Sequence, residues 1–132
     1  MANTLFPKGK KKILDADIDL LVDTIKAVMV PSSYSYDSTD EFLSDLGTTL
    51  GTAQTLASKT TTDGVFDAAD ITFPTVTGGS TAKAVVLYKD TGSAATSPVI
   101  DYIDTITGFP ATTNGGNMAI VWDNGAYKIF SL

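Results

Sequence analysis

The sequence predicts a mainly β fold, namely a small antiparallel β-sandwich or partly open barrel with one short α-helix and an extended N-terminal arm. Residues 82–89 are the most apolar run of the chain, and a second apolar segment follows at 98–104. The polar positions are rich in Thr, Ser, Gly and Asp, which suit pleated surfaces and tight turns. Asp-Gly at 63–64 and Asn-Gly at 124–125 separate further short segments. Together these observations indicate short strands joined by tight turns.

The chain of 132 residues corresponds to one domain that can form a core without a disulfide or a metal. We expect an extended arm at residues 1–12 and a single β-rich domain at residues 13–132. Net charge is −6 and every basic residue is a lysine, which disfavours nucleic acid because binding phosphates requires clustered cations. No apolar run is long enough for a bilayer, and no apolar signal segment follows the lysines at 8–12. We therefore expect neither nucleic acid nor a membrane as partner.

The first thirty residues lead from the arm into the first expected strand. Phe6 precedes Pro7 and is therefore biased away from helical geometry, which favours an extended arm. Apolar residues between 13 and 30 recur at helical spacing, yet residues 24–30 are rich in β-branched side chains and are followed by proline. We expect a strand at 24–30 and an irregular segment or helical turn at 15–22.

A short helix is predicted at Ser38–Leu46. Ser38 and Glu41 form a capping-box pattern, and Gly47 follows the last apolar residue. So short a helix is stable only when its apolar face packs on a sheet, which predicts a lid over one end of the β core.

The remaining chain reads as β structure. We expect strands at residues 53–61, 65–67 and 70–73, followed by the central pair. Residues 118–132 predict a hairpin, because an Asn-Gly turn at 124–125 would place Trp122 opposite Tyr127. Both faces of this hairpin are partly apolar, so we expect it to be central or covered by another subunit.

Few residues are available for catalysis. The chain has no Cys and no His, which excludes Ser-His-Asp and Cys-His nucleophiles and zinc sites built from these ligands. The remaining candidates for catalysis are two carboxylate pairs, Asp101 with Asp104 and Asp67 with Asp70. The first pair would point to opposite faces of a strand, and we interpret all four as solvated surface groups. We expect no catalytic residue, no cofactor and no enzymatic activity.

The spacing of Asp15, Asp17 and Asp19 matches the start of an EF-hand calcium loop. Leu20 stands where that loop needs glycine, and Lys26 stands where it needs a bidentate glutamate. We interpret the triplet as a polar segment before a strand, with no metal site, although oxygen ligation in another geometry stays open.

Several segments carry a resemblance to a known group of proteins. They are LFPKG at 5–9, DTIKAVMV at 23–30, EFLSD at 41–45, VLYKDTG at 86–92 and VWDNG at 121–125. Over most of its length the chain resembles small structural proteins of tailed bacteriophages. Among these proteins, it most resembles the capsid decoration (cement) type.

This resemblance implies a virion protein, made in the host bacterial cytoplasm, that binds the major capsid protein on the outer capsid surface and associates with itself as a homotrimer. We expect its contacts in the arm and the C-terminal hairpin, at Leu5, Phe6, Lys8, Lys10, Lys11, Trp122 and Tyr127. The alternative is a tail, neck or fibre-associated protein that binds a receptor or glycan through Tyr34, Tyr36 and Trp122. Core packing is the commoner role of such aromatic residues.

Overall fold

Strand β6 (Thr81–Lys89) is the centre of the largest sheet in the computed structural model, which describes residues 3–132. It pairs antiparallel with β2 (Ile25–Pro31) on one side and with β7 (Val99–Ile103) on the other. The sheet is completed by β1 (Thr4–Leu5) next to β7, β3 (Leu50–Thr55) next to β2, and β8 (Ala111–Thr112) next to the start of β6. The central pair and the strand expected at 24–30 are confirmed.

Both faces of this sheet are buried. Along β6, Val85 and Leu87 belong to one apolar cluster, whereas Val86 and Tyr88 belong to the other, as the two-residue period of a strand requires. A strand covered on both faces reads as a continuous apolar run rather than an alternating one, which explains the composition of residues 82–89.

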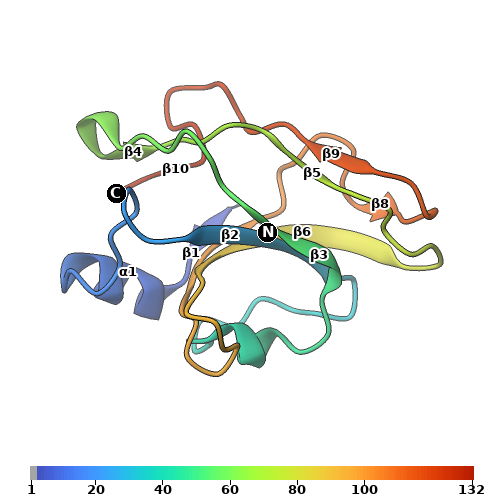
Figure 1. Cartoon of the computed structure of the whole chain (residues 1–132), viewed down its shortest axis with the longest axis horizontal. Helices are drawn as coiled ribbons and strands as arrows, with labels where there is room; N and C mark the ends of the chain where they lie inside the picture. The colour runs from blue at the N-terminus through green and yellow to red at the C-terminus, as the bar shows by residue number, and fades with distance from the viewer. Residues whose placement is uncertain (1–2) are drawn as a thin grey trace.

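An upper layer covers the first face of the sheet (Figure 1). It contains two small antiparallel sheets: β4 (Val65–Phe66) with β10 (Phe130–Ser131), and β5 (Ile71–Phe73) with β9 (Met118–Ile120). The short helix η2 (Thr62–Gly64) precedes β4. The described strands form open sheets arranged in layers, which confirms the mainly β, sandwich-like architecture and shows no closed barrel.

The predicted hairpin at 118–132 is wrong. Ile120 lies opposite Ile71 and Phe130 lies opposite Phe66, so the two halves of this segment pair with strands from earlier in the chain. Neither Asn124 nor Gly125 has the positive φ of a type I′ turn. The earlier strands supply both backbone partners and apolar faces, which a two-stranded hairpin in isolation lacks.

Trp122 follows β9 and is buried in the upper layer, 4% exposed. Its backbone N–H donates to Asp70 Oδ1 at 2.9 Å, and its indole Nε1–H donates to the Ala69 carbonyl at 3.0 Å. Both polar groups are satisfied within the domain, so Trp122 is a core residue rather than part of an exposed hairpin face.

The prediction of an extended arm at 1–12 is also wrong over residues 7–12, which form part of helix α1 (Pro7–Leu14). Met1 and Ala2, which belong to the same prediction, lie outside the described residues. Proline suits the first helical turn, where its missing N–H would have no partner. Phe6 is fully buried, and its N–H donates to the Ile100 carbonyl at 2.9 Å. A Cβ at Gly9 would lie 2.4 Å from the Val99 carbonyl oxygen, so only glycine allows α1 to approach β7 so closely.

The helix predicted at Ser38–Leu46 is reduced to one 3-10 turn, η1 (Leu43–Leu46). The Val99 N–H donates to the Glu41 carbonyl, and the Leu43 N–H donates to the Ser97 carbonyl. Because the Glu41 carbonyl and the Leu43 N–H are bonded to the segment before and within β7, they are not available for α-helical hydrogen bonds, and only the turn after Phe42 is helical. Leu46 is nevertheless buried on the lower face of the sheet, in the covering position expected of the lid. Likewise, the strand expected at 53–61 is confirmed only as far as residue 55.

We predict that Gly9→Ala destabilises the protein by about 1–3 kcal/mol, because the added methyl group overlaps a backbone carbonyl that does not move independently. Helix propensity alone predicts the opposite sign, a gain of about 1 kcal/mol. Urea unfolding followed by circular dichroism measures the difference.

Lys10→Ala, at an exposed position of the same helix, is the matched control and should change the free energy of unfolding by no more than about 0.5 kcal/mol. A Gly9→Ala variant as stable as the parent protein would contradict the close packing of α1 on β7.

Candidate functional site

Helix α1 and the strands β4 and β10 lie at the same end of the molecule (Figure 1). Large apolar side chains are exposed in this part of the chain. We define the terminal apolar surface as Leu14, Leu21, Val22 and Leu132, whose side chains are 50–80% exposed. Leu21 and Leu132 line a cavity of about 350 Å³, and its other walls include Ile13, Phe66 and Phe130. Exposed apolar side chains that gather around a cavity, as Leu21 and Leu132 do here, are typical of a contact surface.

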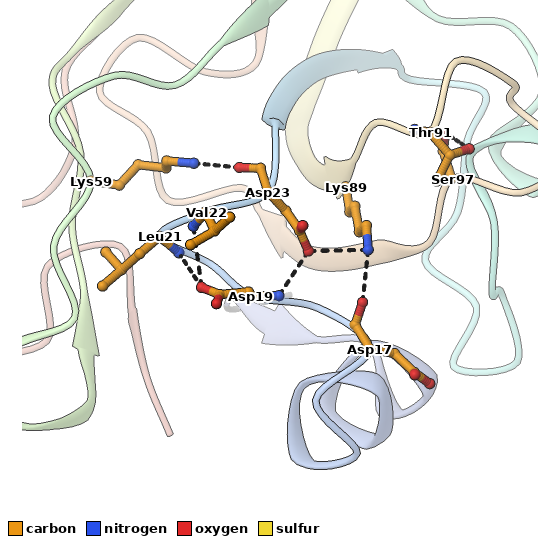
Figure 2. Close-up of polar contacts among 9 residues, drawn as sticks. All are labelled: Asp17, Asp19, Leu21, Val22, Asp23, Lys59, Lys89, Thr91 and Ser97. Carbon is orange, nitrogen blue, oxygen red and sulfur yellow. Dashed lines mark hydrogen bonds and ion pairs between the residues drawn. The ribbon is translucent and has the colours of Figure 1, made fainter.

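The loop that carries Leu21 and Val22 is held in place by its own aspartates (Figure 2). Asp19 Oδ1 accepts hydrogen bonds from the N–H groups of Leu21 and Val22, each at 3.1 Å. Asp23 Oδ2 in turn accepts from the Asp19 N–H at 2.8 Å. The backbone of residues 19–23 is therefore fixed while two apolar side chains remain in solvent, an arrangement that lowers the entropy lost on binding.

Two lysines connect this loop to the rest of the domain, as Figure 2 shows. Lys89 Nζ lies 3.1 Å from Asp23 Oδ2 and donates to the Asp17 carbonyl at 2.8 Å, and Lys59 Nζ donates to the Asp23 carbonyl. Partial desolvation alone would raise the pKa of Asp23, but the Asp19 N–H and the Lys89 ammonium together hold that pKa below its usual value.

The same contacts define the structural roles of Asp15, Asp17 and Asp19, whose spacing matches the start of a calcium loop. Asp19 serves as the cap of its own turn, Asp15 pairs with Lys11, and lysine ammonium groups supply the positive charge in the loop. Residues 3–132 contain no group of three or more acidic side chains placed to hold a metal ion.

The residues expected at an interface differ in exposure: some are buried in the core and others lie at the surface. Phe6 and Trp122 are core side chains and are not accessible to a partner, while Leu5 is half-buried in β1. Lys8, Lys10 and Lys11 lie on the exposed side of α1, and Tyr127 is 70% exposed.

Two of these three lysines already have acidic partners. Lys8 Nζ lies 3.4 Å from Glu41 Oε1, and Lys11 pairs with the carboxylate four residues further along. Within the described chain, residues 3–132, Lys10 forms no ion pair. The helix therefore presents one uncompensated charge beside Leu14.

The aromatic residues of the alternative glycan platform do not come together. Tyr34 and Tyr36 pack around Tyr102 in the lower layer, with ring centroids 6.1 and 5.5 Å away. Trp122 belongs to the cluster on the opposite face of the sheet. No shared stacking surface forms from these three side chains.

The interpretation of Asp101 as a solvated surface group is wrong. Asp101 is 1% exposed because β6 and β1 flank it, with Leu87 on one side and Leu5 on the other. Its Oδ2 atom has no hydrogen-bond partner in residues 3–132. Burial raises the pKa of Asp101 to about 8, although the Tyr102 backbone amide favours the charged form.

Asp101 lines a second cavity, of about 570 Å³. Asn3, Leu5, Asp123, Tyr127 and Lys128 line it too, and Phe130 and Leu132 are shared with the cavity of the terminal apolar surface. Sequence reasoning missed this site. The available signal was an acidic residue inside the otherwise apolar segment 99–103, since a buried strand rarely holds an unpaired carboxylate.

The helices within residues 3–132 are too short or too polar to cross a lipid bilayer. Comparison with protein-family models, with curated protein sequences and with solved structures gives no significant match for this chain.

We predict that Asp101 makes the protein less stable as the pH rises from about 4 to about 8. In this interval the carboxyl stays protonated in the folded protein but is ionised in the unfolded chain, whose pKa is near 3.8. The unfolded state then binds fewer protons, so this group lowers the free energy of unfolding by up to about 1.4 kcal/mol per pH unit.

The measurement is urea unfolding between pH 4 and pH 9 for the parent protein and for Asp101→Asn. This variant lacks the titrating carboxyl group, so it should lose this pH dependence and be the more stable of the two at pH 7. Asp123→Asn, at an exposed carboxylate, is the matched control and should keep the parental slope. Parallel pH profiles for the parent protein and Asp101→Asn would show that Asp101 titrates normally.

Proposed function

We propose that this chain is a structural protein of a tailed-bacteriophage virion, a capsid decoration (cement) protein that binds the major capsid protein on the outer surface of the head. Its role is mechanical, since it bridges and braces capsid subunits. The resemblance of the sequence to such proteins supports the proposal. The structural observation that carries it is the terminal apolar surface, which projects from a rigid β domain.

Two properties of this surface suit a capsid contact. Leu21 and Val22 are displayed by a loop that Asp19, Asp23 and Lys89 hold in one conformation, so little order is lost on docking. Helix α1 adds Leu14 to this surface, and Lys10, one turn away, is the lysine of this helix that forms no ion pair within residues 3–132. An acidic region of the capsid protein next to an apolar pocket is the complementary partner.

Self-association as a homotrimer belongs to the same proposal. A decoration protein on a threefold position gains strength from several weak contacts at once, because binding by one subunit raises the local concentration of the next. The second candidate, a glycan-binding tail or fibre protein, is less favoured because Trp122 lies in the layer opposite Tyr34 and Tyr36.

The copy number of the chain in purified particles tests the proposal. Quantitative mass spectrometry against the major capsid protein should find hundreds of copies, in a simple ratio to the capsid protein. A dozen copies or fewer would place the protein in the neck or tail, and complete absence from the particle would exclude a virion role.

The contact surface itself is tested by cosedimentation of the purified protein with heads that lack it. We predict that Leu21→Ser combined with Val22→Ser weakens binding at least tenfold, because it removes apolar area from the terminal apolar surface. Val121→Ser is the control, since Val121 is 58% exposed but outside this surface, and it should bind as the parent protein does. Equal losses for both variants would rule out a localised contact.

A further inference from the structure

We propose that the cavity between β1, β7 and residues 127–132 binds a primary alkylammonium group through Asp101. This inference concerns a second site, and it does not depend on the virion role proposed above. The group is either the side chain of a lysine on another protein or one end of a free polyamine.

The first argument is that Asp101 combines burial with an unsatisfied oxygen. Its side chain forms part of the wall of a cavity of about 570 Å³, yet it is only 1% exposed. Within residues 3–132, nothing donates a hydrogen bond to Oδ2. A buried carboxyl without a partner costs stability, and such costs concentrate at binding and catalytic sites.

The charges and surfaces of the cavity favour a cation with an aliphatic stem. Asp101 and Asp123 line it against one basic residue, Lys128, so these side chains carry a net negative charge once Asp101 is ionised. Leu5 and Phe130 provide apolar wall for methylene groups, as a lysine stem requires. Tyr127, 70% exposed, also lines the cavity, and the face of an aromatic ring attracts a cation.

Lys128 does not already neutralise Asp101. It lines the same cavity, but no ion pair joins it to Asp101 within residues 3–132. The strongest available stabilisation of the Asp101 carboxylate is therefore a charge-assisted hydrogen bond from an incoming ammonium group.

Binding has a defined proton balance. With a pKa of about 8, Asp101 is mostly protonated at pH 7 in the unliganded protein. An ammonium group that donates to Oδ2 stabilises the carboxylate, so the carboxyl proton leaves to the buffer as the ion pair forms. No covalent bond is made, and about one proton is released for each ammonium bound.

The test is a carbon-13 NMR titration of the Asp101 carboxyl from pH 4 to pH 10, with and without n-butylammonium chloride. We expect a pKa well above the usual carboxyl range without the amine and at least one unit lower at saturation. Calorimetry at pH 7 in two buffers should detect the released proton. A normal Asp101 pKa in the unliganded protein, or an elevated pKa that butylammonium does not change, would overturn the proposal.

Two variants separate a cation site from an anion site. Asp101→Asn is of equal size and should lose butylammonium binding at least tenfold while it keeps the folded NMR spectrum. Lys128→Gln removes a repelling charge and should bind butylammonium severalfold more tightly. If sodium butyrate binds instead, and Lys128→Gln abolishes that binding, the cavity is an anion site and the proposal is wrong.

A third comparison identifies the source of the ammonium group. N-acetyl-lysine methylamide represents a lysine side chain on another protein, and spermidine represents a free polyamine. Tighter binding of one of them assigns the natural ligand class, and failure of both to bind would contradict the proposal even if butylammonium bound.

Discussion

Antiparallel pairing of β6 with both β2 and β7 is the interaction on which the rest of this structure depends. Because these strands satisfy the backbone of β6 from both sides, its side chains can be apolar on both faces. Val85 and Leu87 then support the upper layer, and Val86 and Tyr88 support the lower one. The short strands of the upper layer would not be stable as isolated pairs, and they persist because this sheet gives them an apolar surface to cover.

The docking of the N-terminal segment on β7 has two consequences. Gly9 allows α1 to approach the Val99 carbonyl, and β1 pairs along the edge of β7 opposite Asp101. The first consequence anchors residues that would otherwise remain a solvated arm. The second removes Asp101 from solvent, which raises its pKa and creates one wall of the larger cavity. The docking of one segment thus accounts for both a structural feature and a chemical one.

The two cavities meet at the C-terminal strand. Phe130 and Leu132 line both, so the end of the described chain forms a wall that the two cavities share. β10 pairs with β4 at Phe130–Phe66 and Ser131–Val65, and the flanking N–H groups of Ile129 and Leu132 donate to the Phe66 and Gly64 carbonyls. The stacked rings of Phe66 and Phe130, with centroids 5.1 Å apart, therefore contribute much of the packing that keeps this common wall in place.

The sequence by itself determined the β class, the three central strands β2, β6 and β7 of the large sheet, and the absence of His- or Cys-based chemistry. These follow from local composition, because an apolar run of strand length is buried wherever it lies. Tertiary structure alone decided the partners of residues 118–132, the helix at Pro7–Leu14 and the burial of Asp101. An Asn-Gly turn predicts a hairpin only while no distant strand competes for the same backbone groups, and β4 and β5 compete successfully. Similarly, a carboxylate in a strand is solvated until a segment a hundred residues earlier covers it, and no local pattern records that contact.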